Sequence, residues 1–168
     1  MAGRIKAGEG GLIGSAGEFY VMAELLKRGV IAGLLPRNTR SFDILATKNN
    51  CNVRIRVKTK SQEYSDWQWV IKKDNSIFRD LSDDGDFIVL VDLSMDTKDI
   101  KFYIMPTKQV DEMLRNDHNE WLNTPGKNGR PHDPKNKKRH LSQIKHAKEL
   151  STFLNNWDKL WKISQPAK

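Results

Sequence analysis

The stretch CNVRIRVKTK, residues 51–60, alternates strictly between two kinds of side chain. Val53, Ile55 and Val57 would point to one side of an extended chain, and the basic residues between and after them would point to the other. A period of two is typical of a β-strand that has one face against a core. We therefore predict a strand here, with a row of four basic side chains on its second face: Arg54, Arg56, Lys58 and Lys60.

Further strands are predicted on both sides of this stretch. Short apolar runs at Val30–Leu35 and Phe42–Thr47 come before it, and the Asn49-Asn50 pair between runs is typical of a turn. Three later segments have apolar patterns of strand length: Trp67–Ile71, Phe87–Leu93 and Ile100–Met105. The second of these is apolar except at Asp92, which indicates a strand buried on both faces.

Helices are predicted at the start of the chain and after the strands. Gly14–Gly29 has apolar residues at helical spacing, a second helix should follow Pro106, and Leu141–Trp161 has the periodicity of a C-terminal amphipathic helix. This order predicts an α/β (α+β) fold in which a helix precedes a mixed central sheet flanked by helices. We divide the chain into a glycine-rich lead-in at 1–13, a core at 14–120, and a basic loop with the C-terminal helix packing on the core at 121–168.

Composition restricts the classes of protein. The chain has 168 residues, 29 Lys and Arg against 21 Asp and Glu, and a net charge of +8, which suits one basic domain. The single cysteine, Cys51, excludes an intrachain disulfide and a thiolate metal cage. With no apolar stretch near the ~20 residues of a membrane helix and no secretory signal, we expect a cytoplasmic protein without membrane contact. The positive surplus favours a polyanionic partner.

Much of the surplus lies near the C-terminus. Between Lys127 and Lys148 there are eight basic residues against one acid, Asp133, and prolines and glycines interrupt the first half. We predict an exposed basic loop running into a helix. It would either contact nucleic-acid phosphates or be a solvated insert, and its candidate phosphate contacts are Lys135, Lys137, Lys138 and Arg139.

Three residues could carry chemistry together. Glu18 borders the buried face of the first helix, Asp43 interrupts an apolar strand, and Lys58 belongs to the basic row. A buried acid destabilises a fold unless it has a partner or a metal. Two carboxylates and an ammonium are the parts of a phosphodiesterase in which Mg²⁺ activates water and the lysine offsets developing charge.

The order and spacing of these residues resemble a known family. The segments Gly17-Glu18, Phe42-Asp43-Ile44 and Ile55-Arg56-Val57-Lys58-Thr59 are similar to the motifs of the PD-(D/E)XK nuclease superfamily. They look most like its small helix-first members, such as archaeal Holliday junction resolvases and related uncharacterised bacterial and phage proteins. The resemblance spans Ile13 to Leu114. It implies a restriction-endonuclease-like core of order α-β-β-β-α-β, a DNA endonuclease activity, and a homodimer.

The same resemblance implies the roles of the three residues. Glu18, Asp43 and Lys58 would be catalytic, and Asp43 with Glu18 would hold Mg²⁺ or Mn²⁺. One position departs from the family pattern, because Arg56 stands where an acidic metal ligand is expected, and a guanidinium has no acceptor. A unit positive charge ~5 Å from a divalent ion would cost roughly 7 kcal/mol at an effective dielectric constant of ~20. Glu63 is an alternative, migrated ligand.

Two functions follow from this departure. The first is a metal-dependent endonuclease acting on DNA, with RNA as the alternative substrate. The second is a catalytically inactive nuclease-fold module that binds nucleic acid or a protein partner, with phosphates held by Arg54, Arg56 and Lys60. In plainer interpretations, Glu18 closes a capping box with Ser15, and Asp43 forms a buried ion pair with Arg56 or Lys58.

Overall fold

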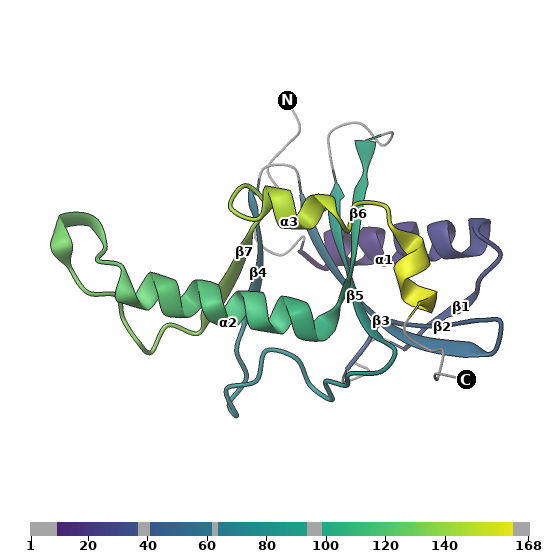
Figure 1. Cartoon of the computed structure of the whole chain (residues 1–168), viewed down its shortest axis with the longest axis horizontal. Coiled ribbons are helices and arrows are strands. Elements are labelled where there is room, and N and C mark those ends of the chain that lie inside the picture. Colours follow the sequence, from purple (N-terminus) through teal and green to yellow (C-terminus); the bar gives the residue numbers. More distant parts are fainter. Residues whose placement is uncertain (1–9, 37–40, 62–63, 94–98, 163–168) are drawn as a thin grey trace.

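The computed structural model describes residues 10–36, 41–61, 64–93 and 99–162. Figure 1 shows its elements. In chain order they are α1 (Gly10–Lys27), β1 (Ile31–Leu34), β2 (Ile44–Lys48), β3 (Cys51–Ser61), β4 (Asp66–Val70), β5 (Asp86–Leu93), β6 (Lys101–Pro106), α2 (Thr107–Asn123), the 3₁₀ turn η2 (Lys127–Gly129), β7 (Lys138–Ser142), α3 (Ala147–Ser151) and the 3₁₀ turn η3 (Trp157–Trp161).

The alternating stretch forms β3, the central strand of a five-stranded sheet of order β1-β2-β3-β5-β6. Strand β3 pairs antiparallel with β2 and parallel with β5, and the other pairs are antiparallel. The predicted mixed sheet flanked by helices is therefore confirmed. A second sheet contains only β4 and β7.

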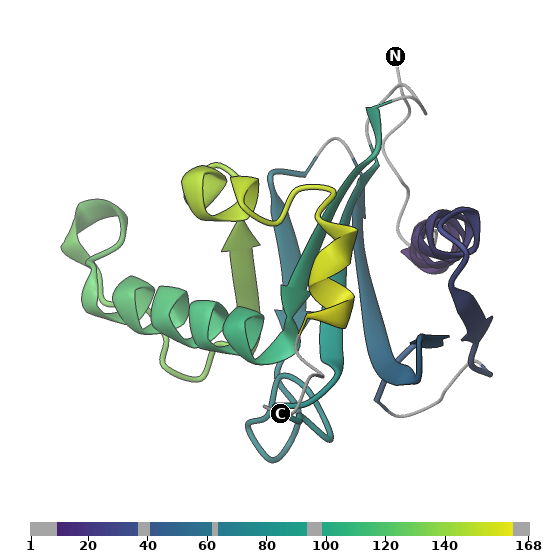
Figure 2. The ribbon, with the colours of Figure 1, turned by 45° about the vertical axis from the view of Figure 1, so that its right-hand side comes forward.

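The two faces of the sheet are covered by different layers, as Figure 2 shows: α1 lies on one side, and α2, α3 and the β4–β7 pair lie on the other. Because side chains alternate along a strand, β5 contributes to both layers. Phe87, Val89 and Val91 pack on the α1 side, while Ile88 and Leu90 pack with Trp67 of β4 and the apolar face of α2.

Helix α1 approaches β3 closely at Gly17. A Cβ at this position would lie 1.9 Å from Thr59 Oγ1, so only glycine fits there without a shift of the strand. The helix begins at Gly10, earlier than predicted. Ser15 consequently lies inside the helix, where its Oγ donates to the carbonyl of Gly11, and the capping-box interpretation of Ser15 and Glu18 is wrong.

The connection between β3 and β5 differs from the order that the resemblance implied. Parallel neighbours are usually joined through a helix, but residues 64–85 contain β4 and turns and no helix. Strand β4 leaves the main sheet and pairs with β7, placing buried Trp67 opposite buried Leu141.

The predicted C-terminal helix over Leu141–Trp161 is also wrong. Residues 138–142 form a strand that pairs with β4. Leu141 is buried there opposite Trp67, and not on the apolar face of a helix. Only one short α-helix, α3, and the turn η3 follow within the described residues. Asn155 between them has φ 51°, a left-handed conformation that ends a helix.

None of the helices in the described ranges has the length and apolar character needed to cross a lipid bilayer.

Candidate active site on strands β2 and β3

Asp43 is fixed at the point where β2 begins. Its backbone N–H donates to the carbonyl of Ile55 at 2.9 Å, and its Oδ2 accepts from the N–H of Val57 at 2.7 Å. The carboxylate therefore lies over the middle of β3, beside the strand that carries the basic row. Its second oxygen, Oδ1, has no hydrogen-bond partner among the described residues.

The basic row of β3 faces the α2 side of the sheet and is lined with aromatic rings. Each of its four cations lies 5.2–5.6 Å from a ring centroid: Arg54 over Phe42, Arg56 over Phe78, Lys58 over Trp69 and Lys60 over Trp67. Two of these rings belong to β4, so the departure of β4 from the main sheet places its tryptophans against the row.

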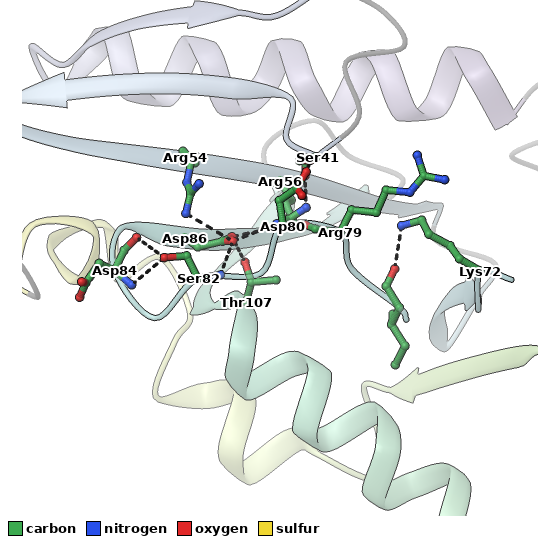
Figure 3. Close-up of polar contacts among 11 residues, drawn as sticks. Ser41, Arg54, Arg56, Lys72, Arg79, Asp80, Ser82, Asp84, Asp86 and Thr107 are labelled. Atoms are coloured by element: carbon green, nitrogen blue, oxygen red, sulfur yellow. Dashed lines mark hydrogen bonds and ion pairs between the residues drawn. The ribbon is translucent and has the colours of Figure 1, made fainter. Parts of the chain in front are cut away.

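Two acids of β5 neutralise most of this row. Asp86 is opposite Arg54 in the register and accepts from Arg56 Nε at 3.1 Å and Nη2 at 2.9 Å (Figure 3). Arg54 Nη2 is 4.0 Å from the same carboxylate. At the other end of the row, Asp92 is opposite Lys60 and accepts from its Nζ at 2.7 Å.

Arg56 has a further structural role. Its guanidinium also donates to the backbone carbonyls of Ser41 and Arg79 (Figure 3). Asp86 in turn accepts from Thr107 Oγ1 at 2.6 Å, at the first residue of α2. Arg56 thus joins the segment before Asp43, the loop before β5 and the start of α2.

These contacts correct the predicted roles of the row. Arg56 is 7% exposed and Lys60 is 6% exposed, and both are ion-paired, so neither side chain is presented to a phosphate. Asp43 is not the acid that orients Arg56, because that acid is Asp86. Arg54 stays half-buried at the edge of the same pair.

Lys58 is the exception in the row. Its Nζ makes no hydrogen bond and no ion pair within 4.0 Å with any residue in the described ranges, and the residue opposite it on β5 is Leu90. Burial lowers the pKa of Lys58, and the charge of Asp43 opposes this effect. Burial likewise raises the pKa of Asp43, against the Val57 N–H and the charges of Arg56 and Lys58. The two groups therefore form a desolvated, electrostatically coupled pair.

Glu18 is half-buried on α1, next to Gly17 and on the helix that covers the opposite face of β3 from Lys58. Glu63, the alternative ligand, lies outside the described residues. Within the described part of the chain, no group of three or more His, Cys, Asp or Glu is placed to hold a metal ion.

The four predicted phosphate contacts near the C-terminus differ in their exposure to solvent. Lys135, Lys137 and Lys138 are exposed, on the loop that enters β7 and at its first residue. Arg139 is half-buried, and its guanidinium donates to the carbonyls of Asn136 and Lys138. Strand β7 is paired with β4, whose Trp69 covers Lys58, so this basic segment lies near the candidate site.

The sequence analysis did not assign a role to Asp86 or to Trp69. The signal for Asp86 was available, since it directly precedes the apolar run Phe87–Val91, where a carboxylate would need a buried partner. Trp69 lies in the strand predicted at 67–71, and its position over the Lys58 ammonium depends on the pairing of β4 with β7.

No protein-family description and no curated protein matches this chain. Two solved structures are similar to it in overall chain course. One is a bacterial homing endonuclease, I-Ssp6803I, with 19% identity and a TM-score of 0.46 over 60% of this chain and 71% of that one. The other is Hjc, a Holliday junction resolvase from Archaeoglobus fulgidus, with 13% identity and a TM-score of 0.47 over 88% of this chain and 93% of that one. Neither likeness assigns a residue or an activity to this chain.

Proposed function

We propose that this protein hydrolyses phosphodiester bonds in nucleic acid at a site formed by Asp43 and Lys58, with Mg²⁺ or Mn²⁺ as cofactor. The observation that carries the proposal is the isolation of Lys58. Arg56 and Lys60, its neighbours in the row, have buried acid partners. Among the described residues, Lys58 has the Trp69 ring and the charge of Asp43 but no ion pair within 4.0 Å. An ammonium with this environment is suited to receive an anionic group of a substrate.

The donor chemistry fits a cation that binds together with its substrate. Mg²⁺ commonly uses one or two carboxylates and completes its shell with water and substrate phosphates. Asp43 offers one oxygen that is free of described hydrogen bonds, and Glu18 is the further carboxylate that the family pattern suggests. When bound, the cation would lower the pKa of a water molecule and offset charge on the phosphate.

The residues themselves would divide the remaining work. Asp43 is held in one orientation by the Val57 N–H, which fixes the direction of its ligand oxygen. The Lys58 ammonium can donate to a phosphate oxygen and stabilise the negative charge that develops there. Arg56 does not oppose metal binding as a free positive charge would, because Asp86 neutralises it and holds its guanidinium.

The surface beside the site supports a nucleic-acid substrate. Lys135, Lys137 and Lys138 are exposed and supply positive charge near β4, the strand that lines the site. We propose DNA as the substrate, with RNA as the alternative. Binding should weaken with salt, and for a duplex log K should fall by about 0.9 per phosphate contacted for each tenfold rise in salt.

A second candidate function is nucleic-acid binding without cleavage. It is favoured by the arginine at the expected ligand position and by the absence of a three-ligand metal cluster from the described residues. In this case Lys58 would contact a phosphate and Asp43 would keep the ammonium oriented. The two functions predict the same binding and differ in turnover.

The test is a cleavage panel of supercoiled, branched and single-stranded DNA and of RNA, with Mg²⁺, Mn²⁺ or EDTA. We expect metal-dependent cleavage by the parent chain, and its loss in both Asp43→Asn and Lys58→Met. Asp99→Asn and Lys101→Met are matched controls, because both side chains are exposed. If the parent leaves every substrate intact but binds with the expected salt dependence, the nuclease proposal is refuted in favour of the second function.

A further inference from the structure

A small polar cleft lies between α2, β7 and the turn that follows β4, and we call it the α2–β7 cleft. Its volume of about 140 Å³ gives room for a few water molecules or for one group of the size of a phosphate. Among the described residues, no acid lines it. The polar side chains that line it are Arg115, His118 and Asn119 of α2, Arg139 of β7 and Asn75 of the turn.

Arg139 is fixed in this cleft by the backbone of its own segment. Its Nη1 donates to the carbonyls of Asn136 and Lys138, each at 2.9 Å. Its Nε and Nη2 make no hydrogen bond, and its guanidinium makes no ion pair, with any residue in the described ranges. A guanidinium presents a rigid fork of donors that matches the oxygens of a phosphate. Arg139 is therefore oriented, half-buried and without a counter-ion in the part of the chain that is described.

Two further groups of α2 add donors to the cleft. Arg115 is held by Asp111, to which its Nε donates at 2.7 Å, and Trp121 stacks on the ring of His118 with centroids 5.4 Å apart. Burial lowers the pKa of Arg139, and the positive charge of Arg115 lowers it further. Burial and the charge of Arg139 likewise lower the pKa of His118. Positive groups that disfavour one another in this way are stabilised by an anion bound between them.

The α2–β7 cleft adjoins the candidate active site. Arg139 lies directly opposite Trp69 in the register of β7 against β4, so the two side chains are on the same face of this pair. The ring of Trp69 in turn lies 5.3 Å from Lys58 Nζ. Figure 1 shows α2 running alongside β4 and β7. A nucleic-acid strand with one phosphate at Lys58 would therefore have a further phosphate within reach of the cleft.

We propose that the α2–β7 cleft binds one phosphate group of a nucleic-acid strand, separate from the phosphate at Lys58. Arg139 is the principal donor, and Arg115, His118 and the amide of Asn119 complete the set. The recognised chemistry is a phosphate oxyanion, which the interior of a strand or either of its ends can supply. This inference rests on the nucleic-acid binding of the proposed function and does not depend on cleavage.

The first test measures binding by the full chain in EDTA, so that cleavage does not contribute. The probes are one single-stranded oligonucleotide with a 5′-phosphate, with a 3′-phosphate, or with hydroxyl groups at both ends. We expect Arg139→Gln to weaken binding by about tenfold or more, since a hydrogen bond to a charged group is lost. The slope of log K against log salt should also fall by about 0.7, the value for one phosphate of a single strand. A loss in all three probes assigns the cleft to an internal phosphate, and a loss in one phosphorylated probe assigns it to that end of the strand.

A second variant keeps the test valid if Arg139→Gln is unstable. Asn119→Asp changes an exposed side chain and places a carboxylate at the cleft, so it should weaken binding to a similar extent. Arg130→Gln and Asn123→Asp are matched controls, because they make the same charge changes at exposed residues that do not line the cleft. Circular dichroism checks that each variant is folded.

The second test locates the bound anion. Inorganic phosphate is added to the full chain, and the ring signals of the histidines are followed by NMR. We expect the signals of His118 to move with phosphate and to stay in place in Asn119→Asp. The ring of His140 is the internal control, because it is exposed and does not line the cleft.

Three outcomes would overturn the proposal: a parent chain that binds none of the oligonucleotides, losses in Arg139→Gln and Asn119→Asp no larger than those of their controls, or His118 signals that ignore phosphate. Failure of the cleft and failure of the nuclease can be told apart. A parent chain that binds through the cleft and cleaves nothing refutes the nuclease alone. A parent chain that cleaves, while neither variant weakens binding, refutes the cleft alone.

Discussion

Arg56 is the residue for which the sequence and the structure predict opposite results. As a phosphate contact, its removal would weaken nucleic-acid binding and leave the fold intact. In the structure its side chain is 8% exposed, and that of its partner Asp86 is 0% exposed. Arg56→Met would leave the Asp86 carboxylate buried, with Thr107 Oγ1 and the Ser82 N–H as donors and with Arg54 4.0 Å away.

Breaking one side of a buried ion pair typically costs about 3–5 kcal/mol, because the remaining charge has lost its partner. Two further donor contacts, to the carbonyls of Ser41 and Arg79, are lost at the same time. We therefore expect Arg56→Met to lose about 3–5 kcal/mol in free energy of unfolding. For a chain of this length the melting temperature should fall by roughly 6–20 °C.

The assay is urea denaturation of four proteins: the parent, Arg56→Met, Asp86→Leu and the double variant. Because the double variant has no unpaired buried charge, it should lose far less than the sum of the two single losses. A loss below about 1 kcal/mol in Arg56→Met, or additive losses in the cycle, would refute the structural role. If Arg56→Met lowered the affinity for nucleic acid and left the stability unchanged, the phosphate-contact interpretation would be restored.

The remaining predictions concern the folding stability that is lost by burying charges at the candidate site, and the packing of α1. Asp43→Asn should be more stable than the parent at pH 7. Burial raises the pKa of Asp43, so ionisation of this group destabilises the folded state as pH rises above the ordinary value of 3.8. The stability gained by Asp43→Asn should therefore shrink as pH falls toward 3.8 in melting curves. Lys58→Met should not lose stability, whereas Lys60→Met should lose about 3–5 kcal/mol in urea, because only Lys60 has a direct ion pair, with the buried Asp92. Gly17→Ala should lose about 1–3 kcal/mol through the clash with Thr59, and Thr59→Ala should restore part of this loss by thermal denaturation.

The sequence was sufficient for the elements whose pattern is local. The alternation of residues 51–60 and the apolar run at 87–93, interrupted at Asp92, predicted β3 and β5, and both pair as strands of the main sheet. Such patterns record which face of a strand is buried, and they do not depend on the identity of the neighbouring strand.

The pairing of β4 with β7 could not be derived in the same way. Leu141 is buried because Trp67 lies opposite it, 74 positions earlier in the chain, and nothing near Leu141 records that contact. Its spacing from Leu150 and Trp157 happened to fit a helical period, and Ile144, which completed that pattern, is 78% exposed. A long-range contact overrode the local periodicity.

The candidate site could be predicted only in part, because it too depends on contacts between strands that are distant in the sequence. Asp43 and Lys58, which the sequence analysis grouped, each affect the pKa of the other through their charges. The neutralisation of Arg56 depends on the register of β3 against β5, which sets Asp86 opposite Arg54 and within reach of Arg56. Sequence alone gives the charges on each strand and not the register that pairs them.

The register of β3 against β5 also leaves Lys58 opposite an apolar residue. Strand β5 places its acids opposite the two ends of the basic row, at Arg54 and Lys60, and places apolar Ile88 and Leu90 opposite Arg56 and Lys58. Arg56 is long enough to reach Asp86, but Lys58 has no described acid within 4.0 Å and is desolvated among aromatic and apolar side chains. A methionine would fill this position without the cost of burying a charge. We infer that the charge of Lys58 serves a bound anion. A phosphate oxygen beside Asp43 would supply the negative partner that β5 does not provide opposite Lys58.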